Sequence, residues 1–435
     1  MSAISAAPAA TARRSRARRA HRMPVEHSML LTATLCLLAL GAVMVYSASA
    51  PSLLVGSGGS GTGELVSFAV WSAVGLAAME LVARRGVSVL RALTGPLLGL
   101  AFFLLIAVKL PGLGHATNGA QRWIGAGPLK FEPSELMKLA LVLYSAEVLA
   151  GRATNPERLR VALKRLIIVA CAAGLLVVTQ PDLGTTLVIA FSLTSMVFAA
   201  GVPLRLLFIG AAALVGLVLM FAAVQPYAVA RLTSFIDPWA HANGSGYQAV
   251  WGQIAIGSGG LLGRGPGGGV TKDLYLPNGS TDFILAVIGE ELGVVGICGV
   301  LFLYGMVIYA GLRTAKAALD PYSMLLAAGV TSLIAVQAIL NVFAVLSIAP
   351  LTGVPLPFVS YGSSSLLVML SGMGILLAVS RQNAAGLRIV ERTRARNPRR
   401  SEDGRSATDR DRSRRNGRAR DAGAGDRRRA YGEAS

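Results

Sequence analysis

The sequence predicts an all-α, polytopic membrane protein with about ten transmembrane helices and a large outer loop between the seventh and eighth helices. Of its 435 residues, 53% are hydrophobic and only 14% are charged, whereas soluble domains carry about 25% charged residues. The mean hydropathy is +0.58. Long apolar runs and a regular alternation of basic loops complete the pattern.

Ten apolar runs are long enough to cross a hydrocarbon core of about 30 Å. They are 29–49, 65–83, 93–109, 135–150, 164–180, 183–200, 203–225, 283–311, 323–348 and 363–381. The three cysteines, Cys36, Cys171 and Cys298, all lie inside such runs. This placement argues against a disulfide framework or a zinc site.

Basic residues gather in alternate loops and in both tails. They occur at 13–22, 84–85, 152–165, 205, 313–316 and throughout the C-terminal tail. An even number of helices puts both termini on one side, and the positive-inside rule makes that side the cytoplasm. The formal net charge of +19 is thereby explained without a nucleic-acid partner.

The sequence divides into a membrane domain, 28–385, and two tails, 1–27 and 386–435. Residues after Val390 include no Leu, Ile, Val or Phe and are rich in Arg, Asp, Gly and Ser. Such a segment cannot bury a core, so we expect both tails to be disordered and cytoplasmic. They would attract anionic lipid headgroups; docking of an acidic cytoplasmic partner is the alternative.

Two long loops, 110–134 and 226–282, lie on the predicted outer side. The second places Trp239, Tyr247 and Trp251 at spacings suited to the membrane interface. It continues into a glycine cluster from Gly257 to Gly269. That cluster is either a flexible linker or a backbone cradle for a phosphate, with Arg264 supplying positive charge.

Charged residues flank the fourth apolar run. Arg122, Lys130, Glu132, Glu135 and Lys138 fall within one short stretch. Glu135 and Lys138 are three residues apart, so they share a helical face and can pair. The pair either neutralises itself for structural reasons or serves a site, since ionisable groups inside membrane bundles are functional candidates.

Three acids mark the start of the eighth apolar run. Asp282 precedes it, where a carboxylate could simply cap the helix. On a straight helix Glu290 and Glu291 would lie roughly 12–14 Å further along, inside the bilayer. Buried carboxylates need partners, and Lys138 or Arg122 are the natural ones. The sequence therefore predicts a charged pocket that opens to the outside.

Irregular backbone is predicted within residues 341–365. Pro350, Pro355 and Pro357 interrupt the apolar pattern, and residues 360–365 offer hydroxyl groups. Non-helical backbone at membrane depth is tolerated where it lines a cavity or is buried in protein. We interpret this segment as a cavity lining.

At these residues the chain resembles the SEDS family of cell-wall proteins (shape, elongation, division, sporulation), and within it the FtsW division branch. The matching motifs are VMVYSAS (43–49), RWIGAGPLKFEPSELMK (122–138), QPDLGT (180–185), RLTSFIDP (231–238), GYQ (246–248), GSGGLLGRG (257–265), LP (276–277), TDFILAVIGEELG (281–293) and PLTGVPLPFVSYGSSS (350–365). The family usually has His where this chain has Ser280, and often Gly-Gly-Ser at 362–364. The first departure puts a helper role for position 280 in doubt.

The resemblance implies an inverting glycosyltransferase that polymerises lipid II into glycan strands at the outer face of the cytoplasmic membrane. It makes Asp282 the catalytic base. The residues expected to bind substrate are Arg122, Lys138, Arg264, Ser360 and Ser364. Those expected to support the pocket are Trp123, Glu135, Glu290, Glu291 and Pro357. No metal ligand set or cofactor is evident, and a divalent cation is left open.

The implied partners are lipid II, membrane lipids, a class B penicillin-binding transpeptidase and other divisome proteins at the septum. Three alternatives stay open: a lipid II flippase, a non-catalytic scaffold, and an elongation-type, RodA-like polymerase. A flippase predicts an ionisable relay near the midplane with access from both faces. A scaffold predicts that the Asp282 region can vary without loss of polymerisation.

Overall fold

The structure, a computed structural model, describes residues 25–49, 62–117, 120–125, 130–151, 155–205, 226–271, 276–277 and 279–396, with two single positions at 210 and 216. Residues 1–24 of the predicted tail 1–27, residues 397–435 of the predicted tail 386–435 and most of the predicted helix 203–225 lie outside these residues. The chain divides after Asn383 into two compact units. The contacts discussed below belong to the first unit.

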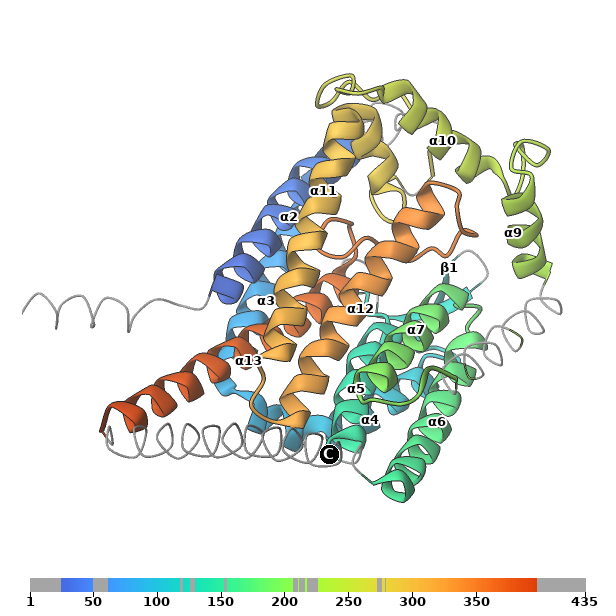
Figure 1. Ribbon diagram of the computed structural model, residues 1–435. Coiled ribbons are helices and arrows are strands. Elements are labelled where there is room, and N and C mark those ends of the chain that lie inside the picture. Colours follow the sequence, from blue (N-terminus) through green and yellow to red (C-terminus); the bar gives the residue numbers. More distant parts are fainter. Residues whose placement is uncertain are drawn as a thin grey trace, which may run out of the picture. The chain divides into compact units, whose positions relative to one another are not determined.

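The described residues are mainly helical (Figure 1). The helices are α2 (Val25–Ser49), α3 (Thr62–Arg85), α4 (Val87–Ala107), α5 (Pro133–Leu149), α6 (Pro156–Val178), α7 (Leu183–Ala199), α9 (Pro226–Ile236), α10 (Tyr247–Gly259), α11 (Ile284–Lys316), α12 (Pro321–Val345) and α13 (Ser363–Arg396). Seven of them, α2, α3, α4, α6, α11, α12 and α13, are long and apolar enough to cross a membrane. The predicted helical membrane fold is confirmed, and the large loop after residue 225 carries α9 and α10.

Short polar signals start several helices. The side chain of Asn155 accepts hydrogen bonds from two backbone N–H groups of α6, at 3.0 and 3.2 Å. Asp182 caps α7 through Thr185 N at 3.0 Å, and Asp320 caps α12 through Ser323 N at 2.9 Å. Proline stands at the first positions of α5, α6 and α12. These residues satisfy or remove the unpaired N–H groups of a helix start.

The first long loop forms a small antiparallel hairpin that the sequence analysis did not predict. It pairs β1 (Gly114–Thr117) with β2 (Ala120–Ile124), and a bridge from Ile124 to Phe131 extends it. A Cβ atom at Gly114 would lie 2.0 Å from the carbonyl oxygen of Val108, so only glycine fits there. Strands this short carry too little periodicity to be predicted.

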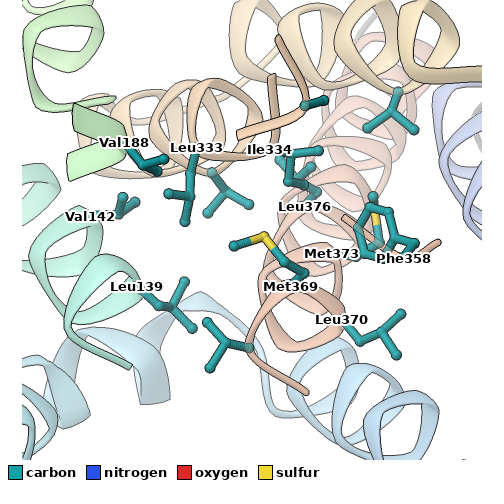
Figure 2. Packing of buried hydrophobic residues seen from close by; sticks show 14 of the residues in the cluster. Leu139, Val142, Val188, Leu333, Ile334, Phe358, Met369, Leu370, Met373 and Leu376 are labelled. Carbon is teal, nitrogen blue, oxygen red and sulfur yellow. The ribbon is translucent and has the colours of Figure 1, made fainter. Parts of the chain in front are cut away.

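Helix α13 lies at the centre of the bundle and α3 and α4 lie at its margin. Inside the first unit, 83% of the apolar window of α13 is buried, against 17% for α3 and for α4. Figure 2 shows the core where side chains of α5, α7, α12 and α13 meet around Met369. Beyond the predicted tail boundary at residue 386, α13 continues to Arg396.

Candidate active site

Asp282 lies in the turn directly before α11 and is held by groups from three elements. Its carboxylate accepts a hydrogen bond from Thr281 Oγ1 at 3.0 Å and lies 3.5 Å from Gln248 Nε2 on α10. Its backbone carbonyl accepts a hydrogen bond from Asn341 Nδ2 on α12 at 2.7 Å. The side chain itself is half-buried, so the acid is fixed without being sealed off.

Asn341 joins Asp282 to the proline-rich segment, residues 350–357. The same Nδ2 group donates to the carbonyl of Val354 at 2.8 Å. Asn341 is 1% exposed, deep among apolar neighbours, where an unsatisfied amide would be costly. One buried side chain thus fixes both the turn that carries Asp282 and the irregular backbone beside it.

The segment 350–357 is non-helical, as the prolines predict. Tyr304 OH donates to the carbonyl of Pro357, and Ser360 Oγ accepts from Leu356 N at 2.8 Å. Tyr361 N donates to the carbonyl of Ser280 at 2.9 Å. Pro357 and Ser360 therefore shape the backbone next to Asp282; their predicted roles in supporting the pocket and binding substrate stay predictions.

Arg231 of α9 is the cation beside Asp282. Its Nη1 donates to the carbonyl of Leu351 at 2.9 Å. A Cβ atom at Gly353 would lie 3.8 Å from Arg231 Nη1 and 3.9 Å from Asp282 Oδ2. Gly353 has φ +69°, a conformation that favours glycine. The guanidinium and the carboxylate therefore come together over a glycine.

The environment raises the pKa of Asp282 above its ordinary value. Burial is the main cause; the hydrogen bond from Thr281, the positive charge of Arg231 and the contact with Gln248 act in the opposite direction. A carboxyl with a raised pKa is a stronger base than an exposed one once it is ionised. The position of Asp282 suits proton abstraction.

Glu135 and Lys138 form the ion pair that their spacing predicts, with 2.8 Å between Lys138 Nζ and Glu135 Oε1. Lys138 Nζ also donates to Gln337 Oε1 at 2.7 Å. Gln337 Nε2 in turn donates to the carbonyl of Pro355 and to Ser365 Oγ, both at 3.1 Å. The side chain of Lys138 is 0% exposed, so the pair is linked to the proline-rich segment from within the core.

Arg122 lies between the end of α6 and the start of α7. Its Nε donates to the carbonyl of Gln180 at 2.8 Å, and its Nη2 donates to that of Pro181. Its Nη1 lies 3.8 Å from Asp182 Oδ1. Carbonyl groups at a helix end attract cations, so the position of Arg122 suits a structural role as well as the predicted substrate contact.

The hairpin loop is attached to the start of α13. Ser364 Oγ accepts from Glu132 N at 2.9 Å, and Ser363 Oγ donates to the carbonyl of Lys130 at 2.9 Å. Trp123 stands opposite His115 in the hairpin. Burial, with the negative charges of Asp182 and Glu135, raises the pKa of Glu132 to about 8.

Glu290 and Glu291 lie in the first half of α11, which differs from the single straight helix that the sequence analysis assumed; the depth predicted for them in the membrane stays a prediction. Within α11, Gly293 adopts φ 66° and ψ −163°. A Cβ atom at Gly296 would lie 3.3 Å from Ile288 Cγ2, although eight residues of straight helix rise about 12 Å. The two halves of α11 therefore meet at a sharp bend, and both glutamates stand just before it.

The partners of these glutamates also differ from those predicted. Lys138 and Arg122 are engaged elsewhere, as described above. Glu290 accepts from Val270 N at 2.8 Å and lies 3.8 Å from Arg264 Nη1. Glu291 accepts from Ser47 Oγ at 2.7 and 2.9 Å and from Gly267 N at 3.0 Å. Gly267 N of the glycine cluster and Val270 N just after it thus bind carboxylates, which leaves these two donors unavailable to a phosphate.

The structure places residues around Asp282 that differ from the partners selected in the sequence analysis. Asp282 is joined by Arg231, Gln248 and Asn341, which the sequence analysis did not select. Arg231 and Gln248 lie in motifs that carried the family resemblance, and Asn341 is a polar residue inside an apolar run; both were usable signals. In the described part of the chain no three His, Cys, Asp or Glu side chains converge as metal ligands. A divalent cation can also be held by one or two carboxylates together with substrate phosphates, so the cation left open above stays open.

Fold and site together define a polytopic helical membrane protein with an acid held among its helices beside a cation. The model of the cell cycle protein family of FtsW, RodA and SpoVE matches residues 27–385. The chain belongs to this family.

Its relatives are similar over most of their length. Stage V sporulation protein E of Bacillus subtilis is 38% identical over 361 residues, covering 81% of this chain and 96% of that protein. The probable peptidoglycan glycosyltransferase FtsW of Coxiella burnetii is 36% identical over 358 residues, covering 81% and 95%.

Solved structures agree. A structure of a peptidoglycan synthase complex that coordinates polymerization and crosslinking matches with a TM-score of 0.68 and 30% identity, covering 81% of this chain and 97% of that chain. The rod shape determining protein RodA of Thermus thermophilus matches with a TM-score of 0.59 and 29% identity, covering 81% and 96%.

Proposed function

We propose that this chain is a peptidoglycan glycosyltransferase that polymerises lipid II into glycan strands. The carrying observation is the half-buried carboxylate of Asp282 beside the guanidinium of Arg231. The names of the FtsW relatives support the activity. The family resemblance supplies the substrate, a lipid-linked disaccharide–pentapeptide, and the inverting course of the reaction.

The reaction needs one base and one cationic contact. The acceptor sugar hydroxyl attacks the anomeric carbon of the donor while the bond from that carbon to the lipid diphosphate breaks. Asp282 takes the proton of the attacking hydroxyl. The departing diphosphate carries the bonding electrons away, and a nearby cation stabilises its growing negative charge. Direct inversion requires no carboxylate nucleophile.

Arg231 is the described cation that best fits the diphosphate contact. It lies over the same glycine as Asp282, and an arginine fork matches phosphate geometry. The contacts predicted for Arg122, Lys138 and Arg264 stay predictions. All three bind protein groups here. Arg231 also donates to a protein carbonyl, that of Leu351, and it is preferred because it lies beside Asp282.

The location and partners follow from the same proposal. Several apolar helices make this a multi-pass membrane protein. We place Asp282 towards the outer face and both termini in the cytoplasm because the basic loops predict that orientation. Septal localisation and a class B penicillin-binding transpeptidase partner are supported by the FtsW relatives and by the matching peptidoglycan synthase complex.

The test is polymerisation of labelled lipid II by the purified full-length protein and by Asp282→Asn, each with and without the transpeptidase. Asparagine keeps the size and polarity of the side chain and removes the base. We expect a folded, inserted and inactive variant. Near-normal polymerisation by Asp282→Asn would overturn the base assignment.

A further inference from the structure

The bend in α11 makes the placement of Asp282 depend on a short half-helix. The half-helix 284–292 is separated from Asp282 by Phe283 alone, and the chain turns sharply at Gly293. The helix loses regular backbone bonds at such a bend. Contacts other than the backbone hydrogen bonds within α11 must therefore hold this half-helix in place.

Backbone groups of the glycine cluster do this. Arg264 N donates to the carbonyl of Glu290 and Gly265 N donates to that of Glu291, both at 3.0 Å. Beyond the bend, Val294 N donates to the carbonyl of Gly260 at 3.0 Å. The loop therefore joins both halves of α11 and bridges the break.

Side chains tighten the same junction. Glu290 and Glu291 are both 0% exposed. Thr271 donates to Glu290 through its backbone N at 3.2 Å and through its hydroxyl. The hydroxyl of Ser47 at the end of α2 donates to both oxygens of Glu291. A loop, a half-helix and a neighbouring transmembrane helix thus meet at two buried carboxylates.

We propose that Ser47, Gly263, Thr271, Glu290 and Glu291 form a clamp that positions Asp282 for catalysis. These are positioning residues, because they act on Asp282 through residues 284–292 and do not reach its carboxylate. The inference rests on the proposed function. It gives the glycine cluster a role that is neither a flexible linker nor a phosphate cradle.

Two glycines of the loop offer a matched test. A Cβ atom at Gly263 would lie 2.1 Å from the carbonyl oxygen of Glu291, whereas a Cβ atom at Gly265 would meet nothing within 4 Å. Both have positive φ, +78° and +91°, so alanine brings similar backbone strain at either position. Only Gly263→Ala forces the loop away from the half-helix.

The experiment compares Gly263→Ala with Gly265→Ala in the full-length protein, with fluorescent lipid II as substrate. Because a misplacement of about 1 Å can lower a rate about 100-fold, we expect kcat of Gly263→Ala to fall about 10- to 100-fold. We expect KM for lipid II to stay within about twofold, and hydrogen exchange in 284–292 to become faster. Gly265→Ala keeps the N–H group that donates to the carbonyl of Glu291 and adds a Cβ atom that meets nothing within 4 Å. It therefore carries the backbone strain without the clash, and its kcat and exchange should stay close to those of the unchanged protein.

Equal kcat in the two variants, or a change in KM alone, would overturn the clamp. If Gly263→Ala does not fold, Ser47→Ala against Ser49→Ala gives the same comparison, since the hydroxyl of Ser49 bonds to carbonyls of its own helix at 2.8 and 3.2 Å. Asp282→Asn is measured alongside. Activity in Asp282→Asn would contradict the proposed function. If Asp282→Asn is inactive but kcat is equal within the pair of glycine variants and within the pair of serine variants, only the clamp is contradicted.

Discussion

Arg231 and Asp282 come together over Gly353: a Cβ atom there would lie 3.8 Å from Arg231 Nη1 and 3.9 Å from Asp282 Oδ2. The two residues are separated by the whole of α10 and the glycine cluster in the sequence. In the proposed reaction, Asp282 is the base for the attacking hydroxyl and Arg231 is the cation for the leaving diphosphate. The opposite charges also make the pKa of Asp282 lower than burial alone would make it.

The rate of polymerisation should rise with pH as Asp282 loses its proton, which gives the pH profile an ascending limb. The base acts when it is deprotonated, and burial raises its pKa above the ordinary value of 3.8. The limb therefore lies at a higher pH than it would for an exposed aspartate. A pH profile of kcat on labelled lipid II checks this. A limb whose midpoint lies at or below pH 3.8, the ordinary value, would contradict it.

Arg231→Met should lower polymerisation and shift that limb to higher pH. The variant removes a positive charge that lowers the pKa of Asp282, so the carboxyl keeps its proton to a higher pH. Arg231→Lys, which keeps the charge without the fork, should retain more activity and shift the limb less. An unshifted limb in Arg231→Met would show that the two groups do not interact in the working enzyme.

Asn341→Ala should reduce both stability and kcat. The change leaves the buried carbonyls of Asp282 and Val354 without their shared donor, at a cost of about 1–3 kcal/mol each. The matched control is Asn383→Ala, which removes a bond of 3.0 Å from another buried asparagine to the carbonyl of Thr314. Thermal unfolding should show a loss in both variants, and kcat should fall only in the first. Equal kcat values would reduce Asn341 to a packing residue.

Stability should depend on the ionisation of Glu132. Its pKa is raised from 4.5 to about 8 in the folded protein, so the folded state holds the proton more tightly than the unfolded state does. The free energy of unfolding then falls as pH rises from about 4.5 to about 8. Glu132→Gln mimics the protonated form and should weaken this fall. Thermal unfolding of both proteins at pH 5 and pH 8 measures the difference, and identical pH dependence would contradict it.

The sequence predicted what depends on apolar length and local spacing. The membrane-spanning segments, the pairing of Glu135 with Lys138 and the irregular segment at 350–357 all follow from patterns within a few residues. The partners of Asp282 could not be predicted in this way, because α9, α10 and α12 bring Arg231, Gln248 and Asn341 together from distant parts of the chain. The bend of α11 at Gly293 could not be predicted either, because a glycine within an apolar run gives no sign of its φ angle. The partners of Glu290 and Glu291 were missed for the same reason, since they depend on how the glycine cluster meets this bend.

Variants at Lys138 can distinguish a structural role of this residue from a contact with the substrate. Lys138→Met leaves Glu135 buried with no counter-charge and Gln337 without its donor, which should cost about 3–5 kcal/mol. Pairing it with Glu135→Gln removes the stranded charge, so thermal stability should recover. Since the side chain of Lys138 is 0% exposed and has two protein acceptors, we expect polymerisation to recover as well. Measuring unfolding and polymerisation on the same preparations decides the matter: a stable but inactive double variant would make Lys138 a diphosphate contact.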